Sequence, residues 1–208
     1  MEILNQISEL LQKGKMKDVT ELTQKSLSEG IAASKILDDA LVKGMSIIGE
    51  KFKKNEVYVP EVLIAARAMN AALKILEPEL LKNNVKAKGI IVIGTVKGDL
   101  HDIGKNLVAI MFKGAGFTVV DCGVDVSAEK FVEEAKKSNA DLIGLSALLT
   151  TTMVNMKEIV TKAHAAGVTA KILIGGAPVT DNFAREIKAD GYAPDAASAV
   201  DIAKTFLN

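Results

Sequence analysis

The sequence contains two histidines, and one of them stands in a segment with the residue types of a metal site. His101 lies in the run Gly98-Asp-Leu-His-Asp-Ile-Gly104, two residues after Asp99. At that spacing in a loop, the Asp99 carboxylate can accept a hydrogen bond from one ring nitrogen and leave the other as a neutral metal ligand. A loop histidine that only satisfies its neighbouring carboxylate gives the same pattern. The motif alone therefore leaves both interpretations open.

The elements around this motif predict a doubly wound, Rossmann-like α/β domain. Short apolar strands alternate with helical stretches, which is typical of a parallel sheet with helices on both faces and right-handed crossovers. The predicted strands cover Gly89–Thr95, Thr118–Asp121, Leu142–Ser146, Lys171–Ile174 and Asp190–Ala193. The predicted helices begin at Lys105, Ala128, Met153, Thr180 and Ala196.

The order of these strands predicts where a ligand binds. In such sheets the first and third strands usually flank the point where the strand order reverses, so the loops carrying His101 and Ser146 should open into one crevice. We expect Gly94, Ser146, Gly175 and Gly176 to line it. Glycines there let a flat heterocycle approach the backbone closely.

The first 86 residues have a helical apolar period with breaks near Gly14, Gly30 and residues 55–60. Pro60 suits the first turn of a fourth helix, and Pro78 is expected to end it. The pattern predicts a four-helix bundle. A polar segment at residues 82–88 indicates the domain boundary, so we expect a helical domain at 1–86 and an α/β domain at 87–208.

Composition argues against several functions. Lys plus Arg and Asp plus Glu number 26 each, without the basic excess of a nucleic-acid or anionic-membrane binder. The single cysteine, Cys122, excludes an internal disulfide and a thiolate zinc cluster. The sequence shows neither a signal peptide nor an apolar run of the ~18 residues that a bilayer span needs, so we expect a cytoplasmic protein.

Three spaced elements together resemble a known family. Asp99-x-His101-x-x-Gly104 is followed after 41 residues by Ser146-Ala-Leu148, and after 26 more by Gly175-Gly176. This set is similar to the cobalamin-binding fingerprint of corrinoid methyl-transfer proteins, and to the cobalamin-binding module of methionine synthase.

The resemblance implies a cofactor and its ligands. Cobalamin binds with its nucleotide base detached from cobalt, and His101 takes the lower axial position. Asp99 and Thr152 complete a relay behind it, so Asp99, His101 and Thr152 are the expected catalytic residues. The implied cofactor-binding residues are Gly98, Asp99, Leu100, His101, Asp102, Ile103, Gly104, Ser146, Leu148, Thr150, Gly175, Gly176 and Ala196.

The resemblance extends to the N-terminal half, where Gly49–Phe52 and Tyr58–Val62 are similar to the family's helical cap over the corrin. It implies a stand-alone methyl carrier of anaerobic one-carbon metabolism, inactive alone. Its partners are a substrate-specific corrinoid methyltransferase, a second methyltransferase acting on coenzyme M or tetrahydrofolate, and a reductive activation protein. Methanol, a methylamine and an aryl methyl ether all remain open as methyl donor.

Three alternatives remain beside the methyl carrier. A cobalamin-dependent mutase subunit shares the histidine motif but has no helical cap in front. A cobalamin-dependent regulator needs a DNA-reading helix-turn-helix and a basic face. A flavodoxin-like domain without cofactor has to treat all three motifs as accidental.

Overall fold

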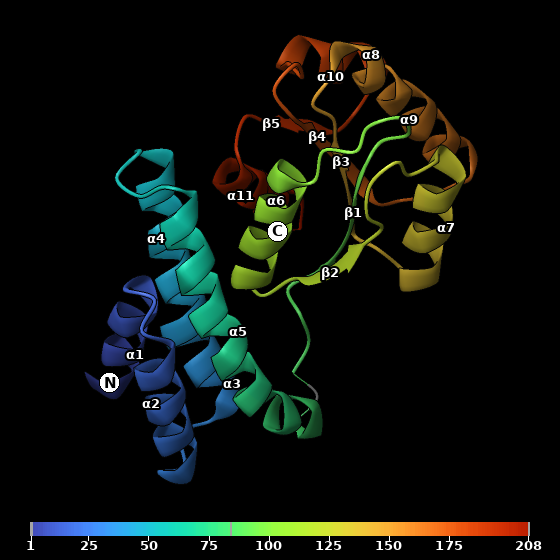
Figure 1. Cartoon of the computed structure of the whole chain (residues 1–208). Helices are drawn as coiled ribbons and strands as arrows, with labels where there is room; N and C mark the ends of the chain where they lie inside the picture. Colours follow the sequence, from blue (N-terminus) through green and yellow to red (C-terminus); the bar gives the residue numbers. More distant parts are fainter. Residues whose placement is uncertain (1, 84, 208) are drawn as a thin grey trace. The chain divides into compact units, whose positions relative to one another are not determined.

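The computed structural model describes residues 2–83 and 85–207 (Figure 1). The chain divides into two compact units, one of residues up to 87 together with 114–116, the other of residues 88–113 and 117 onward. Within the described residues, no helix combines the length and the apolarity that a bilayer span requires.

The first unit is helical, as predicted. Its elements are α1 (Glu2–Gln12), α2 (Met16–Ser28), α3 (Ala33–Ile36), the π-helical η1 (Leu37–Val42), α4 (Lys43–Lys53) and α5 (Val59–Lys82). The elements α3, η1 and α4 follow one another without a break. Apolar side chains that recur at helical spacing on α1, α4 and α5 are buried, among them Ile7, Leu11, Met45, Met69 and Leu76.

The α5 helix begins as predicted but ends later. Pro60 lies in its first turn, and the Glu61 carboxylate accepts a hydrogen bond from the Tyr58 N–H at 3.0 Å. The expectation that Pro78 ends the helix is wrong, since α5 continues to Lys82. A proline removes one helical hydrogen bond, and here only the last turn follows it. Asn83 closes that turn by donating from Nδ2 to the Glu79 carbonyl at 2.7 Å.

The second unit holds a five-stranded parallel sheet in the order β2-β1-β3-β4-β5. The strands are β1 (Ile90–Thr95), β2 (Thr118–Asp121), β3 (Leu142–Ser146), β4 (Lys171–Gly175) and β5 (Gly191–Ala193). The strand order reverses between β1 and β3, as predicted. In the register Thr95 pairs with Ser146 and Ser146 with Gly175, so the carboxyl ends of β1, β3 and β4 lie side by side.

Helices cover both faces of this sheet (Figure 1). They are α6 (Ile103–Gly114), α7 (Ala128–Ser138), α8 (Thr150–Met153), α9 (Asn155–Ala165), α10 (Asp181–Ile187) and α11 (Ala196–Phe206). The predicted starts at Ala128 and Ala196 are confirmed. The helix expected at Lys105 begins two residues earlier, and Thr180 caps α10 by accepting a hydrogen bond from the Phe183 N–H. The helix expected at Met153 is two segments, α8 and α9.

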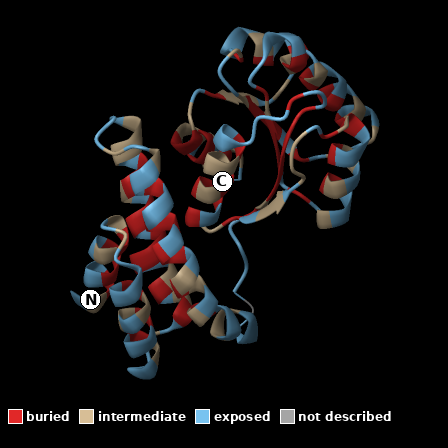
Figure 2. Ribbon diagram, in the orientation of Figure 1, coloured by how far each residue is buried: buried red, intermediate tan, exposed pale blue. Residues whose placement is uncertain are grey.

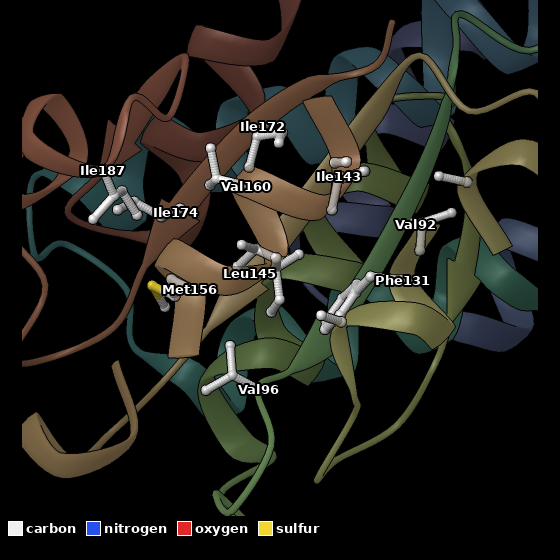
Figure 3. Packing of buried hydrophobic residues seen from close by; sticks show 14 of the residues in the cluster. Val92, Val96, Phe131, Ile143, Leu145, Met156, Val160, Ile172, Ile174 and Ile187 are labelled. Atoms are coloured by element: carbon white, nitrogen blue, oxygen red, sulfur yellow. The ribbon is translucent and has the colours of Figure 1, made fainter. Parts of the chain in front are cut away.

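One buried apolar cluster lies between the sheet and α7, α9 and α10 (Figure 3). Val92, Ile143 and Ile172 from the strands pack against helical residues such as Phe131 and Val160. The neighbouring residues Ile91 and Ile93 are buried as well, so β1 is covered on both faces, as Figure 2 shows. This explains why β1 and β3 read as continuous apolar runs.

The expectation that Gly94 lines the ligand crevice is wrong. A Cβ atom at this position would lie 2.8 Å from the Phe131 ring, inside the core beneath α7. Gly94 is therefore required by the packing of Phe131. In a strand buried on both faces, the sequence pattern does not tell which side a glycine opens.

Candidate functional site

His101 lies in the loop of residues 96–102 that joins β1 to α6, and its side chain is half-exposed at 51%. Its Nδ1 atom is 2.7 Å from Oδ1 of Asp99, so the hydrogen bond predicted from the spacing is present. The same oxygen accepts the His101 backbone N–H at 3.1 Å. Asp99 itself is wholly buried, with 0% exposure. The carboxylate thus fixes both the ring and the backbone of the histidine.

The second oxygen of Asp99 binds the segment that follows β3. Its Oδ2 accepts from Thr152 Oγ1 at 2.6 Å and from the Leu148 N–H at 2.8 Å, with the Leu149 N–H at 3.4 Å. Thr152 is buried in the first turn after Leu149. The predicted series His101, Asp99, Thr152 is therefore a continuous chain of hydrogen bonds between two loops.

These donors keep Asp99 ionised. Burial by itself raises the pKa of Asp99, but the hydrogen bonds from Thr152, Leu148 and His101 outweigh it and hold that pKa well below its ordinary value. An ionised carboxylate only accepts hydrogen bonds, so Nδ1 of His101 must be the donor. When the imidazole is neutral, the lone pair of Nε2 is then free to bind a metal.

Three further contacts hold the loop, and the sequence did not reveal them. The buried hydroxyl of Thr95 donates to the His101 carbonyl at 2.8 Å. Asn155 donates from Nδ2 to the Lys97 carbonyl at 2.8 Å. The Val96 N–H donates to the Ser146 carbonyl at 3.0 Å. The sequence offered one signal for these contacts, a threonine at the end of a buried strand. That pattern does not indicate which group the threonine hydroxyl binds.

The start of α6 is anchored by an ion pair between a buried lysine and an exposed aspartate, which the sequence did not reveal. Lys105 is 3% exposed, and its Nζ lies 2.5 Å from Oδ2 of Asp121 at the end of β2. Burial raises the pKa of Asp121, but the hydrogen bonds from Lys105 and the Gly123 N–H, together with the charges of Lys105 and Lys113, outweigh it, so that pKa lies below its ordinary value. Lys105 also donates to Asn106, whose amide donates to the Asp102 carboxylate. This network ties Asp102, next to His101, to β2.

The other predicted residues of the motif form an exposed surface. Leu100 is 72% and Ile103 76% exposed, and Leu148, from the segment after β3, is exposed too. Gly98 has a left-handed φ of 79°, and a Cβ atom at Gly104, in the first turn of α6, would meet open space. Large apolar side chains left in water beside a half-exposed imidazole favour a ligand with apolar edges.

The remaining predicted residues lie at the ends of β3, β4 and β5. Ser146 ends β3 half-buried, Thr150 begins α8 exposed, and Ala196 begins α11 buried. Gly176 has a φ of 129°, and a Cβ there would lie 1.8 Å from the Ala147 carbonyl oxygen. The close approach of these two backbones by itself requires glycine at position 176.

If His101 binds a metal, that metal would have to bring its other ligands with it. Among the residues that the structure describes, no group of three or more His, Cys, Asp or Glu side chains is placed to hold a metal ion. Burial raises the pKa of Cys122 to about 11, so its thiol is not a ready ligand. A single carboxylate-held imidazole suits a metal inside a macrocycle. The fold and site together define a cofactor-binding α/β protein.

Family models and relatives identify that cofactor. One B12 binding domain model matches residues 89–201, and a second matches residues 3–77. The chain is 41% identical to a corrinoid protein of Desulfitobacterium hafniense (strain Y51), over 100% of this chain and 98% of that protein. It is 42% identical to the trimethylamine corrinoid protein of Methanosarcina barkeri, over 90% and 88% of the two chains.

Solved structures agree with these relatives. The chain is similar to the methanol:cobalamin methyltransferase complex MtaBC from Methanosarcina barkeri, with a TM-score of 0.87, 30% identity and coverage of 99% of this chain and 80% of that chain. It is also similar to a cobalamin-binding protein from Desulfitobacterium hafniense DCB-2, with a TM-score of 0.81, 31% identity and 98% coverage of both. The chain belongs to the family of B12-binding corrinoid proteins, which confirms the predicted resemblance, and its cofactor is a corrinoid.

The hydrogen bonds of Asp99 predict a pH-dependent contribution to the stability of the cofactor-free protein. In Asp99→Asn one side of the amide must present an NH2 group to donors, so we expect a loss of about 1–3 kcal/mol at neutral pH. The folded pKa lies below the unfolded value of ~3.9, so the advantage of the wild type should be full above that value and should shrink as the pH falls through the folded pKa.

Chemical denaturation of both proteins between pH 7 and pH 3 measures this difference. Asp195→Asn is the matched control, because asparagine at the N-cap of α11 still accepts the Ala197 and Ser198 N–H groups. An advantage over Asp99→Asn that stays constant down to pH 3 would contradict the pKa assignment.

Proposed function

We propose that this protein is a methyl carrier that binds cobalamin base-off, with His101 as the lower axial ligand. In this proposal it moves a methyl group in the cytoplasm between a substrate-specific corrinoid methyltransferase and a second methyltransferase. The observation that carries the proposal is the half-exposed His101 ring. Its Nδ1 is hydrogen-bonded to an ionised carboxylate, and its Nε2 makes no hydrogen bond to the residues that the structure describes.

The residues present fit a corrin. A corrin would supply four ring nitrogens to cobalt, and the His101 imidazole would supply one further nitrogen from the protein. Leu100, Asp102, Ile103 and Gly104 would lie against the corrin edge. Ser146, Leu148, Thr150, Gly175, Gly176 and Ala196 would hold the nucleotide tail. When bound, the cobalt supplies the nucleophile that accepts and releases the methyl group.

The protein's own residues would keep the His101 ring in place while the methyl group is accepted and released. An imidazole that leaves a metal can take up a proton at Nε2, and the resulting cation is stabilised by the Asp99 carboxylate 2.7 Å from Nδ1. Thr152 and the Leu148 N–H keep that carboxylate in place. Asp99 therefore holds the ring in register whether or not Nε2 is bound.

The helical unit supports the proposal as a cap. The second B12 binding domain model covers residues 3–77 of that unit. Its exposed apolar side chains, Tyr58, Leu63 and Ile64 among them, would exclude water from the reactive face of the corrin. A cap of this kind must move aside when a partner enzyme needs access.

The names of the relatives suggest the partners. Two relatives are named dimethylamine corrinoid protein and trimethylamine corrinoid protein, and one solved relative belongs to a methanol:cobalamin methyltransferase complex. We propose a methylamine or methanol methyltransferase as donor enzyme, a second enzyme that transfers the methyl group to coenzyme M or tetrahydrofolate, and a reductive activation protein. The full-length matches favour this carrier over a mutase subunit or a regulator.

Replacement of His101 tests the axial ligand. His101→Ala should stay folded and still bind corrinoid through the nucleotide crevice, but it should lose the nitrogen ligand. Electron paramagnetic resonance of the Co(II) form measures this through the superhyperfine splitting from the axial nitrogen. His164→Ala, on the exposed end of α9, is the control and should keep the splitting. A splitting that survives unchanged in His101→Ala would eliminate His101 as the ligand.

The need for a separate enzyme tests the carrier role. The reduced, corrinoid-loaded protein mixed with methanol, a methylamine or a methoxylated aromatic should show no change in its visible spectrum until a methyltransferase is added, because unactivated donors are poor electrophiles. Rapid reaction with any of these donors in the absence of a second protein would refute the proposal.

A further inference from the structure

The loop of residues 122–127, which follows β2 and precedes α7, contains an unusual backbone conformation at Asp125. Its φ is 54°, in the left-handed region that few residues other than glycine adopt and that asparagine and aspartate tolerate best. In the described part of the chain, the other such non-glycine residues, Asn55, Asn139 and Lys188, each follow the end of a helix, where a left-handed residue is an ordinary stop. Asp125 has no such explanation.

Asp125 contacts the His101 loop through both its side chain and its backbone. Its Oδ1 accepts a hydrogen bond from the Gly98 N–H at 2.7 Å. Its own N–H donates to the carbonyl of Asp99 at 3.0 Å. The left-handed conformation allows both groups to face the same loop. Asp125 thus holds the two residues that directly precede the motif's leucine and histidine.

The neighbours of Asp125 make this contact rigid. The Val126 N–H donates to the Thr95 carbonyl, and the Thr95 N–H donates to the Gly123 carbonyl, both at 3.0 Å. Val96 and Val126 form a parallel bridge beyond the end of β1. The loop after β2 is therefore an extension of the sheet, and Asp125 projects from it onto the loop that carries Asp99.

We propose that Asp125 is a positioning residue for His101. By fixing the backbone of Gly98 and Asp99, it sets where the buried carboxylate meets both the Thr152 hydroxyl and the imidazole. Asp125 does not touch the ring, so it acts only through Asp99. The inference deepens the proposed function and rests on it only where the role of the ring as a cobalt ligand is concerned.

Two substitutions separate the carboxylate from the backbone conformation. Asp125→Gly keeps the left-handed φ but removes the acceptor for Gly98. Asp125→Asn keeps both an acceptor oxygen and a residue that tolerates this φ. Asn139→Gly, at the left-handed C-cap of α7, is the control for a glycine introduced in a loop at the other end of the sheet.

The first readout is the cofactor-free protein. In nuclear magnetic resonance spectra, the Nδ1 proton of His101 should exchange with water faster in Asp125→Gly, and as in the wild type in Asp125→Asn and Asn139→Gly. Exchange in Asp125→Gly equal to that of the wild type would overturn the inference. So would equal acceleration in Asn139→Gly, because the effect would then be one of general loosening.

The second readout is the cobalamin-loaded protein. Asp125→Gly should bind cobalamin about 10-fold more weakly and show a smaller fraction of Co(II) with axial nitrogen splitting, as losses behind a metal ligand usually do. Asp125→Asn should restore both. Failure of the asparagine to restore them, with normal folding, would overturn the role of the acceptor. A wild type without splitting would refute the axial ligand alone, and the cofactor-free readout would still decide the role of Asp125.

Discussion

The carboxylate of Asp99 is the interaction on which the site depends. It is wholly buried, and each of its oxygens accepts donors from a different part of the chain, one from His101 and the other from Leu148 and Thr152. These donors lie about 50 residues apart in sequence, yet they converge because β1 and β3 are adjacent parallel strands. An unpaired buried carboxylate is costly, so the two loops stabilise each other only when all donors are present. The orientation of His101 is a consequence of that arrangement.

The fold provides this convergence through its strand order. The strand order reverses between β1 and β3, which end at Thr95 and Ser146, and α6 and α8 follow these two strand ends. The loop after β2 supports the histidine loop through Asp125, and Asp121 at the end of β2 holds the start of α6 through Lys105. The site is therefore held by the carboxyl ends of three adjacent strands, β2, β1 and β3.

Much of this arrangement could be predicted from the sequence. The strands, most helix starts and the bond between Asp99 and His101 depend on local periodicity and on a two-residue spacing, which the sequence shows directly. Thr95, Lys105 and Asp125 were missed because their partners are set by strand register and loop geometry, which no short pattern encodes. The prediction for Gly94 was wrong because both faces of β1 are apolar, so the sequence pattern does not show which face of the sheet a residue points to. The prediction that Pro78 ends α5 was wrong because a proline near the end of a helix removes only one backbone hydrogen bond.

The tautomer of His101 in the cofactor-free protein tests this account most directly. Nitrogen-15 resonance spectra of the imidazole, at a pH where the ring is neutral and with His101→Ala for assignment, distinguish a protonated Nδ1 from a protonated Nε2. If Asp99 is ionised and accepts from Nδ1, the proton should be on Nδ1, and Nε2 should have the resonance of an unprotonated nitrogen. A proton on Nε2 would contradict the account, because Nε2, the ring nitrogen that does not contact Asp99, would then have no lone pair for a metal.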